Sequence, residues 1–266
     1  MEYRRLGRTD LQVSVMGLGS GGPSQLGQRI GATEAESRQL ARRALDLGIN
    51  LIDTGEGYGE SEVILGRALA GVPREDYVLC TKFNPVHLRR DPSLDGDPLH
   101  SEADLVESLE RSLRRLATDH VDVYQFHNVR PMQYKAICDR FLPVLRRQQE
   151  AGKVRFIGVT ESFSSDHGHE MLTQALAHNI FDTMMVGYNL LTPLPEEHVL
   201  PEAARWDVGI LVMCAVRRVI ARPERLVALI ASLKDAGDLA REALPETDPL
   251  NWLLHDGVDS VPAAAY

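Results

Sequence analysis

Four side chains that can hold or transfer a proton lie in places where a folded chain can bring them together. Asp53 and Tyr58 share one glycine-rich loop, and Lys82 and His127 each follow an apolar segment. A phenol with an ordinary pKa of about 10 becomes usable near neutral pH when a nearby cation stabilises its anion. Lys82 can supply that cation, and Asp53 can orient the lysine and keep it charged. His127 can hold a carbonyl oxygen in line with the phenol, so the pattern predicts a proton-transfer site.

Each of these residues also has an ordinary structural explanation. Asp53 could be a helix cap, Lys82 a solvated charge at a strand end and His127 a hydrogen-bonded loop residue. Tyr58 could be an aromatic side chain on the rim of the fold. The proton-transfer hypothesis therefore depends on a fold that places all four side chains at one end of a sheet.

The apolar segments predict such a fold. Seven of them read as strands separated by helical patterns, at 15–19, 51–53, 77–81, 121–126, 154–159, 183–188 and 210–213. Short connections and nearly continuous apolar strands are typical of a parallel sheet. No Gly-x-Gly-x-x-Gly turn follows the first strand, which favours a (β/α)8 barrel of the TIM type over a doubly wound sheet. In a barrel, the carboxyl ends of the strands surround one mouth, where the four side chains would meet.

The remaining elements are predicted from capping and turn signals. A hairpin is expected over residues 3–15, before the first strand. Capping residues begin helices at Thr33 and Ser101, because an acidic side chain follows three residues after each. Further helices are predicted at 61–70, 134–151, 168–178, 196–206 and 223–234, and the turn of a last one near Pro262.

Composition limits the partners that we expect. The chain has 266 residues, with 29 basic and 38 acidic side chains and a net charge of −9. No basic run occurs, so neither nucleic acid nor an anionic membrane is an expected partner. The cysteines Cys80, Cys138 and Cys214 lack a paired spacing, which fits a reducing compartment. No signal-peptide pattern begins the chain and no apolar run reaches about 18 residues, so we expect a cytoplasmic protein.

Metal binding is not expected. The pair His167 and His169 has the spacing of two ligands, but no matching carboxylate or cysteine accompanies it.

Several motifs together resemble the aldo-keto reductase family. They are Tyr3-Arg-Arg-Leu-Gly-Arg-Thr-Asp-Leu-Gln-Val-Ser, Ile52-Asp-Thr-x-x-x-Tyr-Gly59, Ser61-Glu with Leu65-Gly-Arg-Ala-Leu69, Thr81-Lys82, the stretch from Leu109 to His127, and Gly152-Lys-Val-Arg-Phe-Ile-Gly-Val159. The resemblance runs from the N-terminus to about residue 216. It implies a (β/α)8 barrel with a catalytic tetrad of Asp53, Tyr58, Lys82 and His127.

The resemblance also implies the reaction and the cofactor. Hydride passes from a nicotinamide dinucleotide to the carbonyl carbon of a small aldehyde or ketone, while Tyr58 donates a proton to its oxygen. NADP(H) is expected over NAD(H). The implied cofactor-binding residues are Ser20, Asp53, Thr160, Glu161, Met185, Met213, Cys214, Ala215, Val216 and Arg217.

Part of this cofactor set departs from the family pattern. Thr160-Glu161 stands where Ser-Asn is common, and Glu cannot donate a hydrogen bond as Asn does. Met185 replaces a usual Gln, and Met213 replaces an aromatic residue that stacks under the nicotinamide. The segment from Cys214 to Arg217 replaces a Ser-Pro-Leu segment that meets the pyrophosphate.

The end of the chain is the largest departure. Family members continue through an eighth strand and its helix, whereas this sequence stops at Tyr266. We expect a single barrel domain over 1–266 that is incomplete at its C-terminus, as a monomer or a homo-oligomer. A barrel that binds cofactor or a partner with little or no turnover is therefore the alternative to a carbonyl reductase.

Overall fold

The computed structural model describes residues 1–87, 99–216 and 219–266. These residues form two compact units. Unit 1 comprises Met1–Val186 and Glu197–Leu211, and unit 2 comprises Gly187–Glu196 and Val212–Tyr266. The expectation of a single domain over 1–266 stays a prediction.

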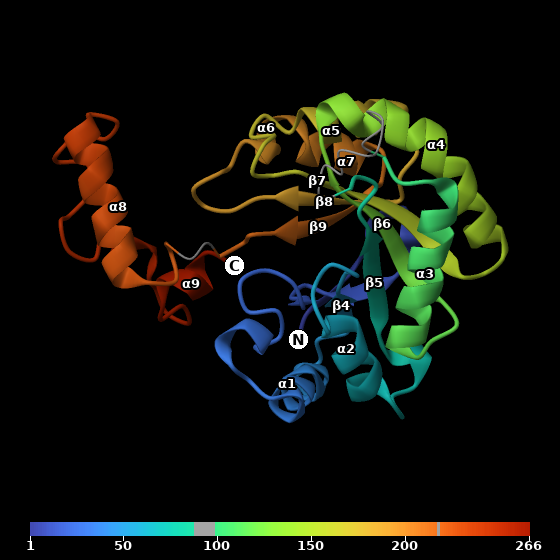
Figure 1. Cartoon of the computed structure of the whole chain (residues 1–266). Coiled ribbons are helices and arrows are strands. Elements are labelled where there is room, and N and C mark those ends of the chain that lie inside the picture. The colour runs from blue at the N-terminus through green and yellow to red at the C-terminus, as the bar shows by residue number, and fades with distance from the viewer. Residues whose placement is uncertain (88–98, 217–218) are drawn as a thin grey trace. The chain divides into compact units, whose positions relative to one another are not determined.

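A parallel sheet in chain order forms the framework. After the antiparallel hairpin of β1 (Tyr3–Arg5) and β2 (Gln12–Ser14), the sheet runs β3 (Leu18–Gly19), β4 (Leu51–Asp53), β5 (Val78–Phe83), β6 (Val121–Val129), β7 (Val154–Glu161), β8 (Thr183–Gly187) and β9 (Gly209–Met213). The sheet curls around an interior, as Figure 1 shows. Seven parallel strands in this order confirm the prediction of an α/β fold of the TIM-barrel type.

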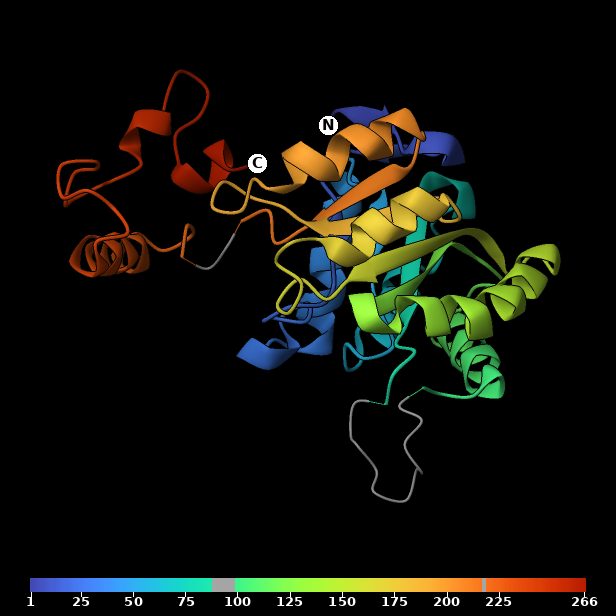
Figure 2. The same ribbon diagram turned by 90° about the horizontal axis from the view of Figure 1, so that it is seen from above.

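Helices of unit 1 follow the strands around the outside of the sheet (Figures 1 and 2). They are α1 (Glu34–Asp46), α2 (Ser61–Leu69), α3 (Glu102–Leu116), α4 (Pro131–Glu150), α5 (Glu170–His178) and α7 (Leu200–Arg205). Thr33 and Ser101 both form the predicted capping boxes. Instead of one helix over 196–206 there are two, α6 (Pro195–His198) and α7. Pro201 explains the break, because it has no N–H to continue the helical hydrogen bonds.

Unit 2 contains α8 (Pro223–Ala236) and the short α9 (Val261–Ala264), near the two positions predicted from sequence. Its core is formed by Leu226, Ile230 and Leu250. Leu239, Leu244, Leu253 and Val261 pack against this core. Across the part of the chain that the structure describes, no helix has both the length and the apolar character needed to cross a membrane.

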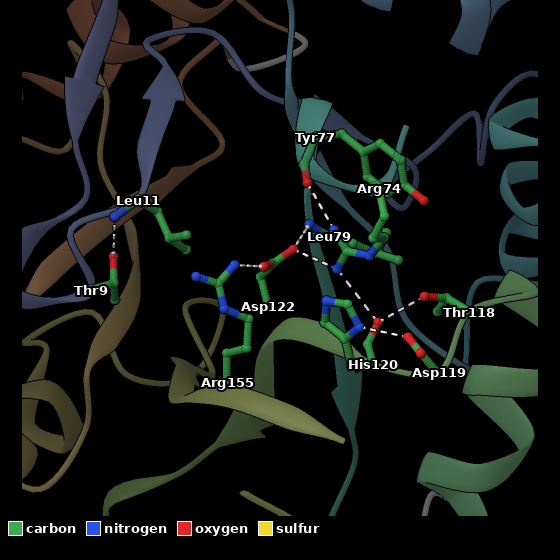
Figure 3. Close-up of polar contacts among 10 residues, drawn as sticks. All are labelled: Thr9, Leu11, Arg74, Tyr77, Leu79, Thr118, Asp119, His120, Asp122 and Arg155. Atoms are coloured by element: carbon green, nitrogen blue, oxygen red, sulfur yellow. Dashed lines mark hydrogen bonds and ion pairs between the residues drawn. The ribbon is translucent and has the colours of Figure 1, made fainter. Parts of the chain in front are cut away.

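A buried carboxylate joins three strands of unit 1 at their amino ends (Figure 3). Asp122, at the start of β6, accepts hydrogen bonds from the Leu79 amide at 2.8 Å, Arg74 at 2.7 Å and Arg155 at 2.5 Å. Its side chain is 1% exposed, whereas those of Arg74 and Arg155 are 22% and 48% exposed. A buried carboxylate is tolerable only with such partners, so this network fixes β5, β6 and β7 at the end of the sheet opposite the predicted site.

We expect Asp122→Ala to lower the free energy of unfolding by about 3 kcal/mol, because it leaves two guanidinium groups and a buried amide without their partner. Asp119→Ala is the matched control, since the Asp119 carboxylate also contacts a basic side chain but is 93% exposed. Urea unfolding of both variants measures the difference. Equal stabilities of the two variants would show that the Asp122 network does not hold the strands together.

Candidate active site

Asp53 and Lys82 form an ion pair in which the lysine is buried and the aspartate side chain is 19% exposed. Asp53 ends β4, and Lys82 lies within β5, where its side chain is 1% exposed. The Lys82 ammonium donates to Asp53 Oδ2 at 2.5 Å and to the backbone oxygen of Thr54 at 2.6 Å. Burial lowers the pKa of Lys82, but the charge of Asp53 and the phenol of Tyr58 outweigh burial and raise that pKa above its ordinary value. Lys82 therefore carries a fixed positive charge at neutral pH.

Tyr58 lies between this ion pair and His127. Its hydroxyl is 3.3 Å from His127 Nε2, and Lys82 Nζ is 5.1 Å from the centre of its ring. Burial is the largest influence on the pKa of Tyr58 and raises it, the neighbouring Lys82 lowers it and the charge of Asp53 raises it, so that the pKa lies above its ordinary value. The sequence suggested a lysine that makes the phenol usable near neutrality. In the structure, burial and the charge of Asp53 together outweigh the effect of the lysine, and the phenol keeps its proton at neutral pH, as a proton donor requires.

His127 is held as a neutral imidazole. Burial, together with the charge of Lys82, lowers its pKa to about 3. A neutral ring has one N–H donor, so it can donate a hydrogen bond to an oxygen without carrying a charge itself. The position of the ring beside the Tyr58 hydroxyl lets both groups face the same oxygen atom.

The low pKa of His127 makes a pH-dependent contribution to stability. Because the pKa of an unfolded histidine is about 6.5, the unfolded chain binds a proton first as the pH falls, and stability is lost between that pKa and about 3. From pH 7 to pH 5 we expect this single group to cost about 2 kcal/mol of unfolding free energy, a loss that His127→Asn removes. Urea unfolding of the wild type and of His127→Asn at pH 7 and pH 5 measures this loss.

The exposed His198, whose side chain is 61% accessible, offers the control. His198→Asn should keep the pH dependence of the wild type. If His127→Asn keeps it as well, His127 is not held neutral by its surroundings.

The strands extend further than the sequence pattern indicated. Lys82 and His127 were expected just after their strands but lie inside β5 and β6. The ladder explains the extension, because Lys82 pairs with Gln125 in the parallel register of β5 and β6. Lys82 is thus fixed on regular backbone at the carboxyl end of the sheet, whereas His127 lies where the register of β6 and β7 shifts between Phe126 and Val129.

Gln125 is a site residue that the sequence reading missed. It lies two residues before His127 on β6, so its side chain is on the same face of the strand. Its amide donates to Asp53 Oδ1 at 3.2 Å, which leaves Oδ2 for Lys82. Alternate residues of a strand point to the same face, so the position of Gln125 two residues before His127 could have predicted it from sequence.

Besides Asp53, four residues of the predicted cofactor set lie in unit 1 with the tetrad. The Ser20 amide donates to the Asp53 backbone oxygen at 2.8 Å. Thr160 accepts a hydrogen bond from the Asn128 amide at 2.8 Å, next to His127. Met185, on β8, is buried and pairs in register with Thr160.

Glu161, the fourth of these residues, ends β7 and is buried against His169. Its Oε2 is 2.8 Å from His169 Nδ1, and the two side chains are 0% and 2% exposed. His169 thus contacts Glu161 rather than a neighbouring metal-binding histidine. Within the residues that the structure covers, no group of three or more histidine, cysteine or acidic side chains is arranged to hold a metal ion.

The rest of the cofactor set is not part of the site described in unit 1. Met213, Cys214, Ala215 and Val216 belong to unit 2. Arg217 lies outside the described residues.

Comparison with known proteins matches the sequence of this chain to one enzyme family. The sequence model of the "Aldo/keto reductase family" matches residues 15–222. Aldo-keto reductase YhdN of Bacillus subtilis is 33% identical over 207 residues, which cover 76% of this chain and 58% of that protein. The NADH-specific methylglyoxal reductase of Escherichia coli is 33% identical over 219 residues, which cover 78% of this chain and 64% of that protein.

A solved structure agrees with these sequence matches. The holo form of aldo-keto reductase AKR11C1 from Bacillus halodurans has a TM-score of 0.69 and 27% identity, over 95% of this chain and 80% of that chain. The chain spans 58% and 64% of the lengths of the two curated relatives, less than two thirds of each.

Proposed function

The chain belongs to the aldo/keto reductase family, and we propose that it is an NAD(P)H-dependent oxidoreductase that reduces small aldehydes or ketones to alcohols. The observation that carries this proposal is the Asp53–Lys82 ion pair, with its buried lysine, beside a protonated Tyr58 and a neutral His127. A barrel that only binds a ligand has no need to bury a charged lysine against a phenol.

In the proposed reaction, Tyr58 and His127 act on the carbonyl oxygen. Both face one oxygen position, where they polarise the C=O bond and so favour attack at its carbon. The bound cofactor, when reduced, supplies the hydride that the carbonyl carbon accepts. As the C=O π electrons move to oxygen, Tyr58 passes its proton to that oxygen, and the nearby Lys82 charge stabilises the phenolate that remains. One C–H and one O–H bond form, and the product is an alcohol.

Two hydroxyl groups of unit 1, near Asp53, are suited to bind a polar part of a ligand. The hydroxyl oxygens of Ser20 and Thr54 are buried and have no hydrogen-bond partner among the described residues. Such groups are costly unless something pairs with them, so they are candidates to hold a polar part of the cofactor. Thr160, Glu161 and Met185 are the further residues of unit 1 that we propose for this role.

We propose NADP(H) rather than NAD(H), as the family resemblance implies. The Escherichia coli relative is named as NADH-specific, so the choice needs a direct measurement. Calorimetric titration with NADP(H) and with NAD(H) measures the affinity for each and so decides between them.

The test of the proposed function is turnover of a reactive aromatic aldehyde with NADPH or NADH, followed by loss of the reduced nicotinamide absorbance. Turnover that disappears with Tyr58→Phe supports the proposal. A chain that binds cofactor but shows no turnover with a range of aldehydes and ketones would instead support the alternative of a binding protein.

A further inference from the structure

The loop between β4 and α2 carries Tyr58 and has few internal contacts to hold it. Residues 54–60 include three glycines. The ends of this segment are held from outside, because Thr54 N donates to Cys80 O at 2.9 Å, Lys82 Nζ donates to Thr54 O at 2.6 Å and Glu60 N donates to Gln28 Oε1 at 2.9 Å. Around Tyr58 the backbone makes the short-range turn contacts Tyr58 N to Gly55 O at 3.0 Å and Ser61 N to Tyr58 O at 3.2 Å. Glycines give the backbone more freedom than other residues do, so such a loop needs outside contacts to keep one conformation.

Glu56 supplies such contacts from the middle of the loop, between the two held ends. Its Oε2 accepts a hydrogen bond from the Ser108 hydroxyl at 2.5 Å, and its Oε1 accepts from Arg111 Nε at 2.5 Å. Arg111 Nη2 also contacts Oε1. Ser108 and Arg111 are three residues apart on α3 and therefore share one face of that helix. Both carboxylate oxygens of Glu56 are thus bonded to α3.

The contacts continue to the strand that carries His127. Ser108 is buried, and its hydroxyl lies 3.3 Å from the hydroxyl of Tyr124, which is fully buried on β6. Glu56 is therefore linked through Ser108 to the same strand from which His127 reaches the phenol. The loop and the strand are connected on the outer side of the sheet as well as at the site itself.

The Tyr58 ring has little space in which to move toward the neighbouring backbone. A Cβ atom on Gly21 would lie 2.6 Å from Tyr58 Cε2, and one on Gly55 would lie 3.3 Å from the same atom. The ring therefore rests directly on the backbone of Gly55, within the loop, and of Gly21, outside it, so a shift of the loop moves the phenol relative to a fixed neighbour. A displacement of about 1 Å at a reacting group can cost about a hundredfold in rate.

We propose that Glu56 is a positioning residue, whose contacts with Ser108 and Arg111 fasten the loop 54–60 to α3 and so hold the Tyr58 phenol beside Lys82 and His127. The consequence for turnover rests on the proposed function, whereas the fastening of the loop does not. An ordinary ion pair on the surface is the competing explanation. Such pairs contribute little, but here the side chains of Glu56 and Arg111 are only 26% and 35% exposed, and buried Ser108 adds a third group.

The chain offers a close control. Glu107 also pairs with Arg111, at 3.5 Å, but lies on α3 and not in the loop, and its side chain is 70% exposed. Glu107→Ala removes a carboxylate from the same arginine without releasing the loop. Glu56→Ala removes the fastening, and Glu56→Gln keeps one oxygen that can accept from Ser108.

The experiment places 3-fluorotyrosine at position 58 and records its fluorine resonance in the wild type and in these variants. We expect Glu56→Ala to shift or broaden the resonance and to lower kcat by about ten- to a hundredfold. The KM for cofactor and the thermal unfolding midpoint should stay near those of the wild type. Glu56→Gln should be intermediate, and Glu107→Ala unchanged.

An unchanged resonance in Glu56→Ala would overturn the proposal. So would a shifted resonance with undiminished kcat in an enzyme that loses turnover with Tyr58→Phe. If the wild type turns over no carbonyl substrate, the proposed function fails separately, and the fluorine resonance alone decides whether Glu56 fastens the loop.

Discussion

Replacing Tyr58 with phenylalanine should lower kcat for carbonyl reduction by a factor of about 10²–10⁴, the usual contribution of a general acid. The substitution removes one oxygen atom and keeps the ring, which rests on Gly21 and Gly55. Cofactor affinity should therefore change little. Steady-state kinetics and a cofactor titration of the same preparation measure the two effects separately.

Tyr188→Phe provides the control for this prediction. Its hydroxyl donates to Glu196 at 2.5 Å, within unit 2, so the substitution removes a hydrogen-bonded phenol that has no part in the tetrad. Tyr188→Phe should keep most of the turnover. If Tyr58→Phe also keeps it, another group donates the proton and the proposed role of Tyr58 is wrong.

The proximity of the four residues proposed as a tetrad was predictable from sequence, because strands of one sheet carry three of them. Asp53, Lys82 and His127 lie on three neighbouring strands of a parallel sheet, and the carboxyl ends of such strands meet at one edge. The apolar segments predict the strands, and the polar side chains at the ends of these strands are the candidate site residues. Strand lengths were underestimated because polar side chains at the ends of β5 and β6 interrupt the apolar runs. The strands nevertheless stay paired, β5 with β6 as far as Phe83 and Phe126, and β6 with β7 again at Val129 after a register shift.

The supporting contacts were not predictable in the same way. Glu56 and Arg111 are 55 positions apart in the sequence, and Gln125 and Asp53 are 72 apart. A local sequence pattern does not predict which distant polar side chains will be in contact after folding. The buried pair of Glu161 and His169 is a similar case, because the sequence suggested cofactor binding for the first residue and an ordinary loop position for the second.

The protonation states also needed the structure. A sequence gives the ordinary pKa of a side chain, whereas the low pKa of His127 depends on burial and on a lysine 45 positions away. The expected balance at Tyr58 is also reversed, because burial and the charge of Asp53 together raise the pKa of the phenol by more than Lys82 lowers it. The choice of residues to propose follows from sequence, but their charges follow from packing.

Lys82→Met should reduce kcat by about a hundredfold or more, because the phenolate left after proton transfer loses its neighbouring cation. Methionine keeps most of the volume of the buried lysine side chain. The substitution also leaves the Asp53 carboxylate with fewer partners, so the thermal midpoint should fall as well. Lys153→Met is the control, since Lys153 also forms an ion pair, with Glu110, but on a partly exposed surface.

The pH profile separates the effect on Tyr58 from a general loss of stability. Lys82 lowers the pKa of Tyr58, so its removal should raise that pKa further. In carbonyl reduction the protonated phenol is the active form, and the decline of kcat at high pH should move to higher pH. In alcohol oxidation the phenolate is the active form, so the rise of kcat with pH should also move upward. An active Lys82→Met enzyme with both limbs unmoved would mean that Lys82 and Tyr58 are not coupled, and that the lysine contributes to folding rather than to proton transfer.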